Sequence, residues 1–188
     1  MATVIPKRAT IDDLLRTEGK AELIGGKVVP LTPTGFRPSR IAARIFRSLD
    51  DHAASVGRGF TFTDSMGFTV SELPSGRESF CPVASYYDGP PPSKRMGFIE
   101  GPPTFAVEVR SEGDYGASAG RALAEKRADY FSAGTLVVWD VDAVGGRILV
   151  NRAGDPEQPI TYTSGQEADA EPALPGWRVA VDRMIGSD

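Results

Sequence analysis

Apolar positions recur at helical spacing over residues 38–56. The members of this stripe are Ile41, Ile45, Leu49 and Val56. Their spacing predicts a long helix with one face against a hydrophobic core. Pro38 suits the first turn of such a helix, and Gly57 marks its end.

A second long helix is predicted over residues 117–132, with Gly134 at the place where a capping glycine follows the last turn. A short helix is predicted near residues 11–15. Thr10 can cap its first turn while Asp13 reaches back to the capping residue, which is the arrangement of a capping box.

Short apolar runs and turn residues predict strands along the rest of the chain. Residues 21–24 and 27–29 are joined by Gly25 and Gly26, which accept the positive φ angles of a tight hairpin turn. Residues 88–103 are rich in proline and glycine and are predicted to be a loop. The other predicted strands lie within residues 60–62, 68–70, 80–87, 104–109, 136–141, 147–151, 161–163 and 177–181.

The order of these elements predicts a mixed α/β fold of the α+β kind, a sheet with two main helices packed against it. The length of 188 residues and the 40% share of hydrophobic residues suit one globular domain spanning residues 1–188. No apolar run approaches the roughly 18 residues of a membrane span, so no membrane partner is expected. A single cysteine and the lack of an apolar leader favour a cytoplasmic protein.

The net charge of −4 argues against a protein that coats nucleic acid by bulk charge, but the charge is spread unevenly. Residues 1–60 carry 10 basic and 6 acidic side chains, whereas residues 61–188 carry 11 and 19. Arg40, Arg44 and Arg47 recur on one face of the first long helix. They are candidate contacts for DNA phosphates, and a solvated helix face is the alternative interpretation.

Several common catalytic motifs are missing from the sequence. It has no phosphate-binding glycine loop with a lysine and no dinucleotide fingerprint. The one histidine, His52, excludes zinc sites built on several histidines. Cys81 lies in an apolar run, where an inert core thiol is expected. Carboxylates and cations remain as the candidate chemistry.

Glu108 interrupts an otherwise apolar strand, where a carboxylate is costly to bury unless a cation or a metal ion uses it. Arg110 lies two residues further on, so both side chains point to the same face of the sheet. Such a pair suits a metal-dependent nuclease, in which an acid holds the ion beside a charge-stabilising cation. A salt pair on the solvent face of an edge strand is the alternative.

An ordered set of segments resembles the Uma-type restriction endonuclease family, whose members belong to the PD-(D/E)XK nuclease superfamily. The set covers nearly the whole chain, although no single segment is specific. It begins with the hairpin AELIGGKVV at residues 21–29 and includes the strand AVEVRS at residues 106–111. It continues with EKR at residues 125–127 and closes with LPGW at residues 174–177.

The resemblance implies a PD-(D/E)XK core and cleavage of DNA that depends on magnesium or manganese. It implies that Glu108 and Glu22 hold the metal ion and that Lys126 stabilises charge on the phosphate. Arg110 stands where the superfamily usually has a strand lysine, so it is a third candidate catalytic residue. DNA is the implied partner, and a homodimer stays open.

One departure from the family pattern lies at the centre of the implied metal site. The family has an aspartate, a principal metal ligand, where this chain has Val83. A valine side chain cannot bind an ion, so magnesium or manganese is expected to bind weakly if at all. Gly25 also replaces an acid of the family hairpin, and the family's histidine is lost near residues 37–39.

These departures lead to two readings of the sequence. The first is a metal-dependent DNA endonuclease with an impaired metal site. The alternative is a catalytically inactive binding or interaction protein on the same fold. The sequence alone leaves open whether the chain is an active enzyme.

Overall fold

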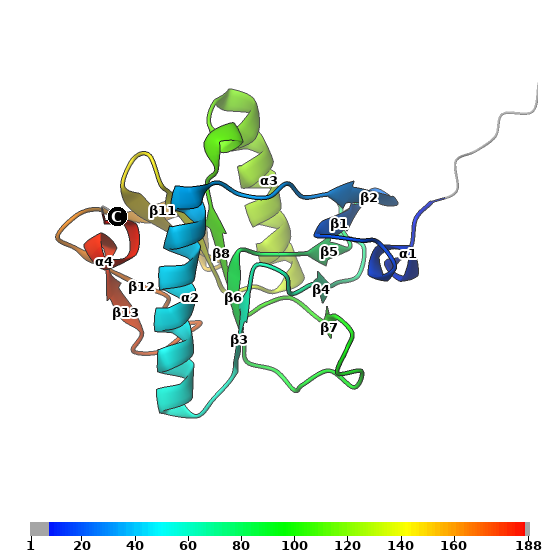
Figure 1. Cartoon of the computed structure of the whole chain (residues 1–188), viewed down its shortest axis with the longest axis horizontal. Coiled ribbons are helices and arrows are strands. Elements are labelled where there is room, and N and C mark those ends of the chain that lie inside the picture. The colour runs from blue at the N-terminus through cyan, green and yellow to red at the C-terminus, as the bar shows by residue number, and fades with distance from the viewer. Residues whose placement is uncertain (1–7, 187–188) are drawn as a thin grey trace, which may run out of the picture.

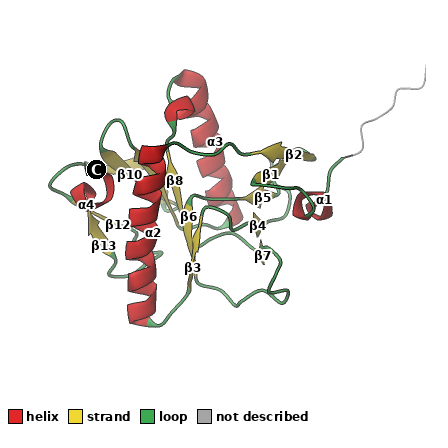
Figure 2. Cartoon of the chain, viewed as in Figure 1, coloured by secondary structure: helices red, strands yellow, loops and turns green. Residues whose placement is uncertain are grey.

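The computed structural model describes residues 8–186, and a six-stranded sheet with the order β11-β10-β9-β8-β6-β3 lies at its centre (Figure 1). Strands β8 and β9 are parallel, and the other neighbouring pairs of this sheet are antiparallel. Its strands are β3 (Phe60–Thr63), β6 (Ala84–Tyr87), β8 (Phe105–Val109), β9 (Val137–Asp142), β10 (Arg147–Arg152) and β11 (Asp155–Tyr162). Figure 2 shows the long helices beside this sheet, which confirms the predicted α+β architecture.

The first long helix, α2 (Phe36–Val56), covers one face of the sheet. Three positions of its predicted stripe are fully buried there, Ile41, Ile45 and Leu49. The fourth position is wrong, because Val56 is 54% exposed and Ala53 is buried instead. Position 53 continues the four-residue spacing from Leu49, whereas Val56 lies on the same side of the helix but in its last turn, where it is left exposed.

The second long helix, α3 (Ala117–Ala133), covers the opposite face and connects the parallel strands β8 and β9, as parallel neighbours require. Alternate residues of β8 enter the two cores. Val107 packs on the α2 side, and Ala106 packs on the α3 side with Tyr130. Glu108 follows in this alternation, so the strand directs its side chain toward α3.

Smaller elements extend the molecule at both ends. The short helix α1 carries the predicted capping box of Thr10 and Asp13, and the predicted hairpin turns through Gly25 and Gly26 at φ angles of 58° and 68°. These elements are α1 (Ile11–Leu15), β1 (Ala21–Ile24), β2 (Lys27–Pro30), β4 (Phe68–Thr69), β5 (Ser79–Phe80), β7 (Ile99–Glu100), η1 (Glu112–Asp114), β12 (Glu167–Asp169), β13 (Arg178–Ala180) and α4 (Val181–Ile185). Strands β5, β4 and β7 form a small sheet in that order, and β12 pairs with β13.

Two predictions in the middle of the chain are wrong in detail. The strand expected over residues 80–87 is two strands in different sheets, β5 and β6. Pro82 stands between them, where a residue without an N–H group cannot continue the ladder. The loop expected over residues 88–103 contains β7, which is only two residues long.

The C-terminal part also differs from the prediction. The strand expected at residues 161–163 is the end of the longer β11, whose Pro156 and Pro159 are tolerated because β11 lies at the edge of the sheet. The strand expected at residues 177–181 ends at Ala180, where α4 begins, and β12 was not predicted. Within residues 8–186, no helix has both the length and the apolar character needed to cross a membrane.

Candidate active site

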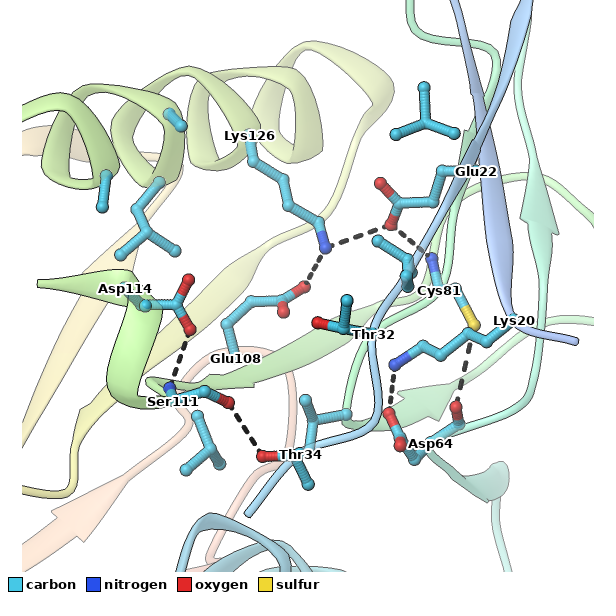
Figure 3. A pocket seen from close by; sticks show the side chains of 18 of the residues that line it. Lys20, Glu22, Thr32, Thr34, Asp64, Cys81, Glu108, Ser111, Asp114 and Lys126 are labelled. Carbon is cyan, nitrogen blue, oxygen red and sulfur yellow. Dashed lines mark hydrogen bonds and ion pairs between the residues drawn. The ribbon is translucent and has the colours of Figure 1, made fainter.

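A pocket of about 450 Å³ lies between the β1–β2 hairpin, the end of β8 and the first half of α3 (Figure 3). Its floor carries Glu22, Glu108 and Lys126, and Lys20 and Asp64 pair with each other in its wall. The other labelled residues of Figure 3 are Thr32, Thr34, Cys81, Ser111 and Asp114. The pocket therefore gathers acids, cations and hydroxyl groups from segments that are far apart in the sequence.

Glu108 points from β8 toward α3, as the alternation of the strand requires. Its Oε1 atom lies 2.8 Å from Lys126 Nζ and accepts a hydrogen bond of 2.7 Å from the Tyr130 hydroxyl group. Among the described residues, none donates a hydrogen bond to Oε2. One oxygen of Glu108 is thus held by the protein, and the second is left for a water molecule or a ligand.

Glu22 is almost completely buried, and both of its oxygens are engaged by protein donors. Oε1 accepts a hydrogen bond of 2.9 Å from the Cys81 N–H group and lies 3.0 Å from Lys126 Nζ, while Oε2 pairs with Arg77. Burial on its own would raise the pKa of Glu22. The positive charges of Lys126 and Arg77 outweigh burial and lower this pKa below the ordinary value.

Lys126 joins the two carboxylates, because its ammonium group contacts Glu22 and Glu108 at once. Burial would lower the pKa of Lys126, but the nearby charges of Glu108 and Glu22 raise it instead, so the side chain stays charged. Lys126 and Glu108 therefore share one part of the pocket, as the roles implied by the family resemblance require. The catalytic role of either residue stays a prediction.

Two residues that the sequence reasoning missed complete this cluster. Arg77 is 8% exposed, and its Nε atom donates a hydrogen bond of 2.9 Å to Asp129 on α3 while another nitrogen pairs with Glu22. Three acids therefore surround two cations, with an excess of one negative charge. Arg77 stands in an irregular loop, 52 residues away from Asp129 in the sequence. No local sequence pattern therefore indicates that these two side chains pair.

Arg110 lies outside this cluster. Its guanidinium group forms two hydrogen bonds, of 2.7 and 2.6 Å, with the carboxylate of Asp140 on the neighbouring strand. Glu108 and Asp140 are directly paired in the β8–β9 register, so the arginine two residues on reaches this acid. Arg110 thus forms a planar two-point ion pair, and its catalytic role stays a prediction.

The three arginines of α2 are in different situations. Arg44 donates hydrogen bonds to the carbonyl groups of Met184 and Gly186, at 3.4 and 3.1 Å, and so holds the end of α4. Arg40 and Arg47 are exposed on the same helix. DNA contact through this stripe stays a prediction.

The residues of the pocket fit a divalent ion poorly. Magnesium requires hard oxygen ligands, usually carboxylates with several water molecules. Val83 lines the pocket where the family pattern has an aspartate, and the Lys126 ammonium lies between the two remaining acids. Among the residues that the structure describes, no three of the His, Cys, Asp and Glu side chains gather as metal ligands.

Three other acids of the chain are engaged elsewhere and do not replace the missing aspartate. Asp114 lines the pocket, but its carboxylate accepts the Ser111 N–H group at 2.7 Å. Asp88 pairs with Arg58, and Glu78 pairs with Arg8. The alternative ligand that would restore a three-acid site is thus not found within residues 8–186.

Cys81 also lines the pocket, but its thiol is poorly suited to nucleophilic chemistry. Burial is the main cause that raises the pKa of this thiol to about 11. The thiol is therefore neutral near pH 7, and a thiolate is the reactive form. This agrees with the inert thiol expected from the sequence.

The lowered pKa of Glu22 predicts acid sensitivity. A carboxyl group whose pKa is lower in the folded state stabilises the fold at pH values above its ordinary pKa of 4.5. This stabilisation is lost as the pH falls through the pKa that the group has in the folded state. We expect the melting temperature to fall with the pH below 4.5, and the fall to be shallower in Glu22→Gln, which has no such group. Calorimetric melting curves from pH 7 down to acid measure this. An equally steep fall in the variant would contradict the prediction.

Comparisons with known proteins agree with this geometry. A family model described as "Putative restriction endonuclease" matches residues 9–182. A solved structure described as a "putative nuclease belonging to DUF820 from Anabaena variabilis ATCC 29413" superimposes with a TM-score of 0.73 at 16% identity. This match covers 94% of this chain and 97% of that chain, and at such identity it shows a shared fold. The search of curated proteins gave no match.

Proposed function

Because the chain belongs to the family described as putative restriction endonucleases, we propose that it is a DNA endonuclease with an impaired metal site, which cleaves phosphodiester bonds weakly at most. The proposal includes DNA as partner, with Arg40, Arg44 and Arg47 as candidate phosphate contacts, and a cytoplasmic location. The exposed positions of Arg40 and Arg47 on α2 support DNA as the partner.

One observation carries the proposal. Glu22 and Glu108 converge on Lys126 in a pocket that has Val83 in place of a third acid. The free oxygen of Glu108 can orient a water molecule, and the ammonium group beside it can neutralise charge on a phosphate oxygen. These residues supply part of the chemistry of phosphodiester hydrolysis. They leave the pocket without the ligand set that tight magnesium binding requires.

The second candidate function is a binding protein without catalysis. It is favoured by the complete pairing of Glu22, whose two oxygens are both held by protein donors. A carboxylate in that state is well satisfied without an ion. Binding of DNA to such a protein would depend on the salt concentration through its phosphate contacts.

Metal titration and plasmid nicking separate the two candidates. We expect calorimetry to show magnesium and manganese binding in the millimolar range or weaker. We expect slow nicking of supercoiled plasmid at millimolar manganese, and its loss in Glu108→Gln. Nicking that is absent under all conditions would favour the binding protein. Micromolar magnesium binding that survives Glu108→Ala would overturn the proposed site.

A further inference from the structure

Phe36 is the first residue of α2 and, at 73% exposed, the most exposed aromatic side chain within residues 8–186. The buried stripe of α2 begins five residues later, at Ile41, and repeats every four residues. At 3.6 residues per turn, Phe36 lies about 140° around the helix from this stripe, so the sheet does not cover it. The packing of the fold therefore gains little from this ring.

The ring lies two residues beyond the rim of the pocket. Thr34 lines the pocket, and its Oγ1 atom lies 2.8 Å from Ser111 Oγ, which ties the segment before α2 to the residues that follow β8 (Figure 3). Two residues span at most about 7 Å of chain, and successive nucleotides of one DNA strand rise by about 3.4 Å. A strand with one phosphate at the pocket would thus bring a base to Phe36 within about two nucleotides.

The surface around Phe36 suits an anionic polymer. Arg40 lies four residues after Phe36, and Arg47 lies seven residues after Arg40, so the ring heads a row of exposed arginines on one side of the helix. Arg37, the next residue, is also exposed. Between Glu22 and Asp50 the sequence has no acid and five cations, which are Lys27, Arg37, Arg40, Arg44 and Arg47. This charge is complementary to a chain of phosphates.

We propose that Phe36 stacks on an unpaired base of bound DNA, and that this contact adds affinity for single strands which duplex DNA cannot gain. An aromatic ring among cations is how proteins hold single-stranded nucleic acid, with the ring against a base and the cations at the phosphates. In a duplex, neighbouring bases cover both faces of each base, so the ring has nothing to stack on. The inference rests on the function proposed above, because it names the form of DNA that the same pocket would receive.

The chain offers a matched control at the other end of α2. Phe60 is the first residue of β3 and is 42% exposed, and it lines a pocket together with Asp50. Asp50 and Asp51 are both exposed there. Acids repel phosphates, so Phe60 is an exposed aromatic ring in surroundings that disfavour DNA. The two phenylalanines therefore differ in the charge around them.

Fluorescence anisotropy at one fixed salt concentration tests the proposal with three labelled probes. These are a thymidine oligonucleotide of about 12 nucleotides, an abasic oligomer of the same length and a hairpin duplex. We expect Phe36→Ala to bind the thymidine oligonucleotide about tenfold more weakly than the natural chain, and to bind the other two probes within about twofold of it. Phe36→Trp should bind at least as tightly as the natural chain, whereas Phe36→Leu should behave like Phe36→Ala because it has no ring. Phe60→Ala should change none of the three affinities.

Every other outcome counts against the proposal. A Phe36→Ala protein that binds the thymidine oligonucleotide as tightly as the natural chain overturns it. An equal loss on the abasic oligomer also overturns it, because that probe has no base to stack on. A Phe36→Leu protein with the natural affinity would show a general apolar contact, such as one made with another protein, in place of stacking. These three results would leave the proposed endonuclease to be decided by metal titration and plasmid nicking. Failure of the natural chain to bind any of the probes would overturn both proposals.

Discussion

Replacement of Arg77 by methionine should lower the free energy of unfolding by about 3–5 kcal/mol, which corresponds to a fall of about 6–20 °C in the melting temperature. Arg77 is the cation shared by two buried acids, Glu22 and Asp129. Methionine fills a similar volume but leaves both carboxylates without this partner. Breaking a buried pair by removing one member is strongly destabilising because the remaining charge is uncompensated.

Urea unfolding at pH 7 measures this effect, and Arg58→Met is the matched control. Arg58 pairs with Asp88 at the surface, where its side chain is 73% exposed. An exposed pair is screened by water and contributes little to stability, so the control should unfold near the natural midpoint. Equal small losses in both variants would show that the Glu22–Arg77–Asp129 network does not hold β1 to α3.

The long elements could be predicted from the sequence because each carries a local signal. The stripe of α2 repeats every four residues, and the glycines of the β1–β2 turn reveal the hairpin directly. The error at Val56 arose at the last turn of the helix, where the sheet no longer lies beneath position 56. The split between β5 and β6 could not be predicted from apolar character, because both strands are buried but belong to different sheets.

The candidate site could be predicted only in part. Glu108 stood out as an acid in an apolar strand, and the family resemblance supplied Glu22 and Lys126. Tyr130 had a usable signal that was missed, since it lies four residues after Lys126 and so on the same face of α3. The partner of Arg110 depends on the register of two parallel strands joined through a whole helix, which no local pattern encodes.

Val83→Asp should restore metal binding to the pocket. Val83 lies beside the strand of Glu108, because its N–H group donates a hydrogen bond of 3.0 Å to the Val107 carbonyl group. An aspartate here adds a third acid next to Glu22 and Glu108. The three acids Glu22, Glu108 and Asp129 already carry one more negative charge than the two cations beside them balance. The new acid raises this excess of negative charge. A divalent ion is the natural compensation.

The expected signature is a protein that is less stable without metal and recovers with it. An unpartnered aspartate costs about 1–3 kcal/mol, or about 2–12 °C in melting temperature. Manganese at a hundred times its dissociation constant returns about 2.7 kcal/mol. Two controls separate the carboxylate from its side effects: Val83→Asn keeps the shape without the charge, and Val29→Asp adds a charge elsewhere in the pocket lining. Neither should respond to manganese.

We expect this variant to bind manganese at least about tenfold more tightly than the natural chain, a gain of about 1.4 kcal/mol, and to nick plasmid only modestly. Cleavage should stay limited because Gly25 offers no side chain where the family hairpin has an acid, and because Lys126 still contacts both Glu22 and Glu108. A plasmid-nicking assay beside the melting curves measures both effects. A Val83→Asp protein that melts lower, ignores manganese and nicks nothing would mean that the site has decayed beyond this one position, and the non-catalytic binding protein would then be the better account of the chain.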